Sequence, residues 1–192
     1  MAITEPIETD ASPDSFRRMD ESTAEQWALI GDRTRTNQGR VADRMIMLLE
    51  SLAHISDGFI TDQLTHCLQT ATMAERAGAD DEMIFGALCH DIGKAISVPN
   101  HGAISAEMIK PYVRDDVYQA IRNHQDFQGK HYYHHFGVPT DLRDQFKDES
   151  WFALCEEFTD DWDQQAFDPD YDTLPLEHFE PLIREITAAA KF

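Results

Sequence analysis

Several of the nine histidines in the 192-residue chain occupy positions where an imidazole could bind a metal. His66 lies between Leu64 and Leu68, close to the apolar side of a stretch with helical spacing. A neutral imidazole buried there needs a hydrogen-bond partner or a metal. On its own, such a histidine is more often a satisfied core residue than a metal ligand.

The adjacent pair His90 and Asp91 adds a carboxylate to this chemistry. The pair ends an apolar stretch, where an unpaired carboxylate would carry a large desolvation cost. A cation relieves that cost, and imidazole nitrogen with carboxylate oxygen suits Fe, Zn or Mn. A carboxylate can offer one oxygen to each of two metals, so Asp91 could bridge them. The alternative is a helix cap or an ion pair with Lys94, which a dipeptide alone does not exclude.

The order of the candidate ligands along the chain favours two metals over one. The series consists of His66, His90, Asp91, His101, His124 and an aspartate near Asp163. They are spread over several helical segments, as a metal site in the core of a helical bundle requires. A single ion would be satisfied by four of them, which would leave His101 and His124 without a function. The sequence therefore predicts a dinuclear centre.

Helices must position these residues. The spacing of apolar residues predicts helices from Ser22, from Val41, over 62–77, from Asp80 to the HDIGK segment, and over 101–110, 115–125, 150–165 and 176–190. Ser22 and Glu25 are interpreted as a capping box, and Gly78 and Pro111 as helix stops. No run alternates apolar and polar residues over the length of a strand. The predicted fold class is all-α.

Length and composition predict one globular domain. Apolar residues make up 42% of the chain and charged residues 27%, the balance of a protein that buries a core. The polar start predicts a flexible segment over residues 1–20, followed by a single domain over 21–192. A formal charge of -20 has the wrong sign for nucleic acid and disfavours an anionic membrane surface.

The expected location is the cytoplasm. No apolar run approaches the roughly 20 residues of a membrane-spanning helix. The N-terminal residues MAITEPIETDASPDS have acids and prolines where a signal peptide has a basic start and an apolar stretch. The three cysteines form no CxxC pair, which fits a reducing compartment.

The ligand series resembles the metal motif of the HD-domain superfamily: a histidine, then an HD pair, then a distal aspartate, with two extra histidines in dinuclear members. The resemblance to the 2-amino-1-hydroxyethylphosphonate dioxygenases rests on QLTHCLQTATMAERAGADDEMIFGALCHDIGK (63–94), WDQQAFD (162–168) and LPLEHFEP (174–181). HDIGK is also similar to the HDxGK of the myo-inositol oxygenases. Both families are mixed-valent di-iron enzymes that use O2 to break a C–P or C–C bond beside a hydroxylated carbon.

This resemblance implies a ligand set. One iron would be held by His66, His90, Asp91 and Asp163, and the other by Asp91, His101 and His124. Asp163 is preferred because its WD matches the WD of the family, and Asp160 and Asp161 are expected on a solvated acidic face. A mixed-valent pair of iron ions (Fe2+/Fe3+) is the implied cofactor.

The resemblance also implies substrate contacts. Lys94 corresponds to the substrate lysine of the inositol enzymes, and Lys130 in GKHYY to that of the phosphonate enzymes. Asp91 and Lys94 are the residues expected to take part in catalysis. Ser56 and Phe59 stand where the phosphonate enzymes have a tyrosine and a glutamate, and the spacing from His90 to His101 is shorter. These departures predict a different substrate.

Three functions are hypotheses at this point. The first is a di-iron oxygenase acting on O2 and a small polar substrate, phosphonate-like or polyol. The alternative is a metal-dependent phosphohydrolase that cuts a phosphate ester with the same ligands and Mn or Zn. The third is a metal-binding or ligand-binding module without activity.

The aromatic and histidine-rich run HYYHHF (131–136) is close to the proposed site in the sequence. Tyr132, Tyr133 and Phe136 could wall a pocket or stack on a quaternary ammonium group, although packing is the more common role of such residues. The histidines of this run, His131, His134 and His135, are expected to be exposed and outside the site.

Overall fold

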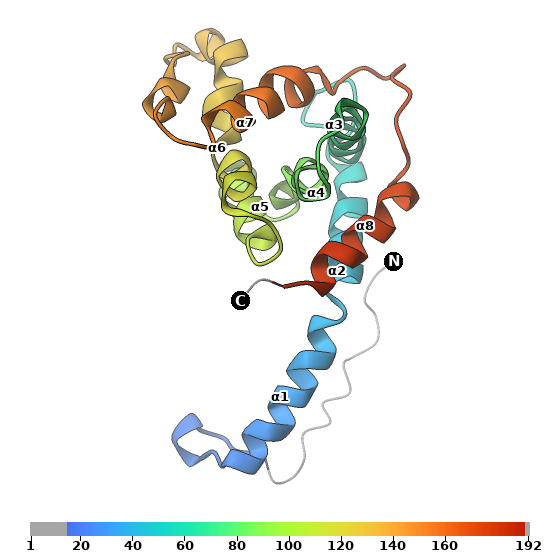
Figure 1. Cartoon of the computed structure of the whole chain (residues 1–192), viewed down its shortest axis with the longest axis vertical. Helices are drawn as coiled ribbons and strands as arrows, with labels where there is room; N and C mark the ends of the chain where they lie inside the picture. Colours follow the sequence, from blue (N-terminus) through green and yellow to red (C-terminus); the bar gives the residue numbers. More distant parts are fainter. Residues whose placement is uncertain (1–14, 191–192) are drawn as a thin grey trace. The chain divides into compact units, whose positions relative to one another are not determined.

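The computed structural model describes residues 15–190, and every regular element in that range is helical, as predicted (Figure 1). The α-helices are α1 (Ala24–Gln38), α2 (Val41–Ser51), α3 (Gln63–Ala77), α4 (Asp81–Cys89), α5 (His101–Ile109), α6 (Asp115–Tyr132), α7 (Phe152–Glu157) and α8 (Leu176–Ala188). Within the described residues, no helix has the length and apolar character needed to cross a membrane.

The chain divides into two units, Met1–Val41 and Ala42–Phe192. In the first unit, α1 starts from a capping box in which the Thr23 hydroxyl accepts from the Gln26 amide and the Gln26 side chain accepts from the Thr23 amide. The prediction that Ser22 begins this box was wrong by one residue, because its hydroxyl donates to the Met19 carbonyl. Residues 1–14 of the predicted flexible segment lie outside the described residues, and a boundary at residue 20 stays a prediction.

In the second unit, local sequence signals set the ends of α3 and α4. The Asp62 carboxylate accepts a hydrogen bond from the Thr65 amide at 2.9 Å, and the Asp80 carboxylate accepts one from the Met83 amide at 3.1 Å. Both are N-cap contacts that satisfy free amides of the first turn. Gly78 ends α3 with a φ of 82°, a left-handed conformation that a side chain would strain.

Two predicted helices differ from the observed ones. α6 continues past residue 125 to Tyr132, because its apolar stripe extends to the fully buried Phe127. The predicted helix over 150–165 is α-helical only to Glu157, followed by a π-helical turn over Phe158–Trp162 and a 3₁₀ turn over Asp163–Gln165.

Helix α4 occupies the centre of the second unit. All of its residues from 83 to 89 are buried, the pattern of a helix surrounded by protein. It contacts α3, α5, α6 and α8 (Figure 1). Since the HD pair follows directly at its C-terminal end, the fold delivers His90 and Asp91 into the interior.

Candidate metal centre

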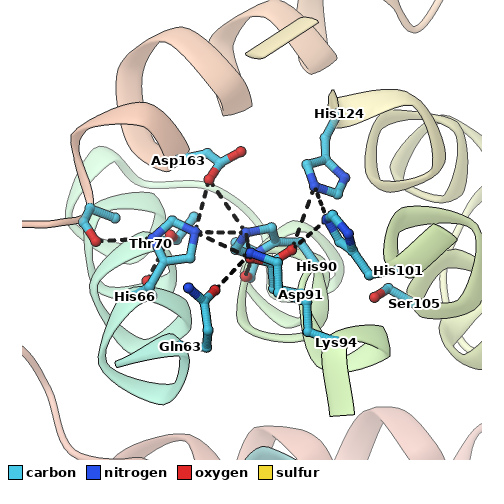
Figure 2. Close-up of polar contacts among 12 residues, drawn as sticks. Gln63, His66, Thr70, His90, Asp91, Lys94, His101, Ser105, His124 and Asp163 are labelled. Carbon is cyan, nitrogen blue, oxygen red and sulfur yellow. Dashed lines mark hydrogen bonds and ion pairs between the residues drawn. The ribbon is translucent and has the colours of Figure 1, made fainter. Parts of the chain in front are cut away.

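Six side chains from separate segments meet in the core beside the end of α4 (Figure 2). They are His66 from α3, His90 and Asp91 after α4, His101 from α5, His124 from α6 and Asp163 after the π-helical turn. None of these six residues is more than 4% exposed as a whole. The structure thus brings together the whole ligand set that the sequence suggested.

The first group of donor atoms comes from two imidazoles and two carboxylates. Nε2 of His66 and Nε2 of His90 lie 3.1 Å apart. Asp163 Oδ1 is 3.1 Å from the first nitrogen and 3.3 Å from the second. Asp91 Oδ2 completes the group at 3.5 and 3.4 Å from the same two nitrogens.

The second group uses the other oxygen of Asp91. Asp91 Oδ1 lies 2.9 Å from His101 Nε2 and 3.6 Å from His124 Nε2, and these two nitrogens are 3.2 Å apart. Each carboxylate oxygen of Asp91 therefore faces a different imidazole pair. That is the arrangement a bridging carboxylate needs.

Backbone carbonyls orient all four imidazoles. The Nδ1 atoms lie 2.7 to 3.0 Å from the carbonyl oxygens of Ala166, Ala87, Val98 and Ile121, for His66, His90, His101 and His124 in that order. A carbonyl only accepts, so each Nδ1 carries a proton and donates it. In the neutral ring this leaves the Nε2 lone pair free to bind a metal.

The carboxylates lack the hydrogen bonds that their burial demands. Asp91 Oδ1 and both carboxylate oxygens of Asp163 are buried without a hydrogen-bond partner. Imidazole nitrogens lie close enough for ion pairs, but none is aligned for a hydrogen bond to these oxygens. Buried anionic oxygens left this way are costly, and a cation removes the cost. These residues therefore fit metal ions, and the buried groups could hold them.

The charges of the group are strongly coupled. Burial opposes a charge on His90, but Asp91 and Asp163 raise its pKa to about 10. Burial opposes ionisation of Asp163, but His90 and His66 hold its pKa well below the usual range. Burial lowers the pKa of His124, which keeps that ring neutral. An entering metal cation takes the place of the His90 proton, so metal affinity falls as the pH decreases.

The HD domain family matches residues 64–177, a range that contains all six side chains of the centre. The chain belongs to this family. Membership indicates a metal-dependent hydrolase or oxygenase. No curated protein matches the chain. The matched range lies wholly within the second unit, Ala42–Phe192, which we call the HD domain below.

Lys94 belongs to the centre of the HD domain. Its Nζ lies 2.6 Å from Asp91 Oδ2 and donates to Gln63 Oε1 at 2.8 Å. The side chain is 12% exposed, and it lines a cavity that also reaches His66 and Asp91. Lys94 therefore lies beside Asp91 on the cavity, and its contact with a substrate stays a prediction.

The structure does not bring Lys130 to the centre. Its Nζ pairs with Asp160 Oδ2 at 3.0 Å, the side chain is 45% exposed, and it does not line the cavity. Asp160 in turn departs from the expected solvated face, because it also accepts hydrogen bonds from His131 at 3.0 Å and from Arg143 at 3.1 Å. The contacts with Lys130 and His131 tie the π-helical turn that precedes Asp163 to α6, and the contact with Arg143 ties it to the 3₁₀ turn Leu142–Phe146.

We predict that Asp160→Asn lowers the free energy of unfolding on the order of 1–2 kcal/mol at pH 7. Burial opposes ionisation of Asp160, but its contacts with Lys130, His131 and Arg143 lower its pKa. The stabilisation by the ionised Asp160 is therefore complete above the pKa of about 4 that an aspartate has in the unfolded chain. It disappears as the pH falls through the lower pKa of Asp160 in the folded protein. Urea titrations of both proteins from pH 7 to pH 3 measure this. Asp161→Asn, at an exposed position, should not change stability.

The cavity has a volume of about 580 Å³, opens over the centre and reaches His66, Asp91 and His101. Its aromatic wall includes Phe167, whose ring stacks on His66 with centroids 4.3 Å apart, and Phe59, which stacks on Phe167 at 4.7 Å. Phe59 is one of the two positions that depart from the phosphonate family. At the other, Ser56 does not line the cavity.

Several cavity residues were missed from the sequence. His131 and His135, expected outside the site, line the cavity. Tyr132 and Phe136, which the sequence analysis gave as possible pocket walls, also line it. Phe167 carried a usable signal, because it lies within the WDQQAFD segment beside the carbonyl of Ala166 that orients His66. No comparable signal in the sequence predicted the direction of the side chains in the irregular turn 133–136.

We predict that His101→Ala reduces the metal content of the HD domain from two ions per chain toward one. The change removes one of the two imidazoles that face Asp91 Oδ1 and leaves the other donor group complete. Elemental analysis of protein purified from iron-supplemented cells gives the content, and circular dichroism checks that the fold is kept. His178→Ala, an exposed imidazole that pairs with Glu75, is the matched control. A fully metallated His101→Ala protein would refute the assignment.

Proposed function

We propose that the HD domain is a di-iron oxygenase that uses O2 to cleave the C–P or C–C bond beside a hydroxylated carbon of its substrate. The observation that carries this proposal is the second imidazole pair, His101 and His124, on the far oxygen of Asp91. A single hydrolytic ion would need only the first donor group, whereas an iron pair uses both. The resemblance to two di-iron oxygenase families supports the choice of metal.

Two irons held by these six residues would supply one position that chelates the substrate hydroxyl and one that activates O2. The chain supplies orientation and charge. The carbonyl contacts of the four imidazoles keep their Nε2 atoms directed at the centre. Lys94, held by Gln63, provides a positive charge for a phosphonate, carboxylate or similar group at the inner end of the cavity.

The aromatic wall has a separate role. Phe167 covers one face of His66, and Phe59 stacks on Phe167, so aromatic rings line this side of the centre. Burial raises the pKa of Tyr132, so its hydroxyl stays protonated at the cavity. Exclusion of water protects a reactive oxygen chemistry from side reactions.

The proposed partners are a small substrate and O2. We do not propose nucleic acid or a membrane as a partner, because the charge of -20 repels phosphate-rich surfaces. The proposed location remains the cytoplasm.

Iron-loaded protein tests the proposal by electron paramagnetic resonance and by oxygen uptake. After partial reduction we expect a mixed-valent signal that hydroxyphosphonates or polyols perturb, and O2 consumption with at least one of them. The His101→Ala protein should lose the signal. Steady hydrolysis of a phosphate ester with Mn2+ or Zn2+, and no O2 uptake with any of these compounds, would instead assign the phosphohydrolase function.

A further inference from the structure

The cavity of the HD domain is polar at its inner end and largely apolar along its walls. His66, Asp91, Lys94 and His101 form the inner end. The walls carry four aromatic rings and one valine, from Phe59, Val98, Tyr132, Phe136 and Phe167, and apolar atoms form most of the exposed lining. Polar side chains interrupt these walls: Asp57, Gln125, Gln128, His131, His135 and Gln164. With about 580 Å³, the cavity lies within the size range of sites that enclose drug-sized ligands. A hydroxyl and a single anionic group would occupy only its inner end.

The mouth of the cavity exposes apolar side chains. Phe59 is 50% exposed, Val98 45% and Phe136 74%. Three further large apolar residues between 42 and 190 are exposed and lie within two residues of a lining residue in the chain: Ile60, Ile96 and Val138. Met47 is the one exposed large apolar residue in this range that neither lines the cavity nor lies so close to a lining residue. Exposed apolar surface concentrated at one place marks a binding site.

The charged residues that line the cavity favour one orientation of a bound anionic ligand. Lys94 is at the inner end, while Asp57 lines the cavity beside Phe59 in the chain. An anionic group is therefore favoured inside, next to Lys94, and disfavoured beside Asp57. The part of the ligand that faces Phe59, Val98 and Phe136 is then its uncharged part.

We propose that the substrate carries an aromatic or branched aliphatic group next to its anionic, hydroxylated end, and that Phe59 is a specificity-determining residue for that group. The inference about the reacting end of this substrate rests on the proposed function, whereas the inference about its apolar end rests on the cavity walls alone. Contact with the ligand would bury the exposed faces of Phe59, Val98 and Phe136 and remove their apolar area from water.

Anaerobic calorimetry on the iron-loaded protein tests the apolar end without turnover. The probes are three pairs that share a head group: hydroxymethylphosphonate with 1-hydroxy-2-phenylethylphosphonate, glycolate with 3-phenyllactate, and methyl phosphate with benzyl phosphate. In at least one pair the phenyl compound should bind about tenfold more tightly or better, the gain expected for burying most of a phenyl ring. The third pair covers a phosphate-ester substrate.

Three variants test whether the mouth of the cavity causes this preference. Phe59→Glu should reduce it to less than about threefold, because a carboxylate replaces the apolar contact. Met47→Glu makes the same kind of change at an exposed apolar residue away from the cavity and should leave the preference unchanged. Phe59→Leu, which keeps an apolar side chain, should retain part of it.

The inference is overturned if no phenyl compound binds more tightly than its partner, including the case in which nothing binds, or if Phe59→Glu keeps the full preference. A second copy of the chain covering the mouth would also overturn it. Sedimentation would then show a dimer that Phe59→Glu dissociates. O2 uptake with small hydroxyphosphonates and no phenyl preference would refute this inference alone. A phenyl preference without any O2 uptake would refute only the proposed function.

Discussion

Asp91→Asn is expected to remove both metals from the HD domain and to lower turnover at least about 1000-fold. Each oxygen of Asp91 faces a different imidazole pair, so one substitution affects both donor groups. An amide brings no negative charge to the centre, and its nitrogen would face imidazole nitrogens or Lys94 in place of an acceptor. Elemental analysis and the oxygen-uptake assay measure the two losses.

Asp161→Asn is the matched control, because Asp161 is an exposed aspartate two residues before Asp163. It should keep full metal content and activity. Near-native circular dichroism of the Asp91→Asn protein would show that the loss is not caused by unfolding. Two metals per chain in that protein would refute the bridging role of Asp91.

Gly93→Ala is expected to lower the free energy of unfolding by about 2–3 kcal/mol or more and to reduce the metal content toward one ion per chain. A Cβ at Gly93 would collide with the backbone of His101, lying 3.0 Å from its carbonyl carbon and closer still to its oxygen. The Gly93 amide also donates to Ser105 Oγ at 2.9 Å. The absence of a side chain therefore lets α5 approach closely enough for His101 to reach Asp91.

Denaturant titrations and elemental analysis measure these two effects. Gly31→Ala is the control, since a Cβ there meets only an arginine side chain at ordinary contact distance, within α1. It should leave metal content unchanged and favour the helix slightly. A Gly93→Ala protein with normal stability and two metals would show that the close approach is not required.

Local signals in the sequence were sufficient for most of the helices. The caps at Asp62 and Asp80 and the stop at Gly78 are contacts within a few residues, so their chemistry can be predicted without the rest of the chain. The one-residue error at Ser22 arose because Ser22 and Thr23 are both good caps, and the Met19 carbonyl competes for the first hydroxyl.

The wide turn over Phe158–Trp162 could not be predicted. A π-helical turn changes the phase of the residues that follow it, so helical periodicity alone cannot place Asp163. Asp163 is fully buried, Asp161 is exposed, and Asp160 lies in a cluster with α6. The choice among three neighbouring aspartates rested on the WD resemblance, and the packed structure gives each of them different surroundings.

The sequence by itself indicated that a histidine within an apolar helix face, such as His66, enters the core, because it is carried inside with that face. Only the tertiary structure decided their partners. It placed Lys94 beside Asp91 and paired Lys130 with Asp160, which is thirty residues away in the sequence. It also placed His131 and His135 in the lining of the cavity. Such contacts depend on how separate helices pack and on the direction of each side chain, and spacing along one helix does not contain that information.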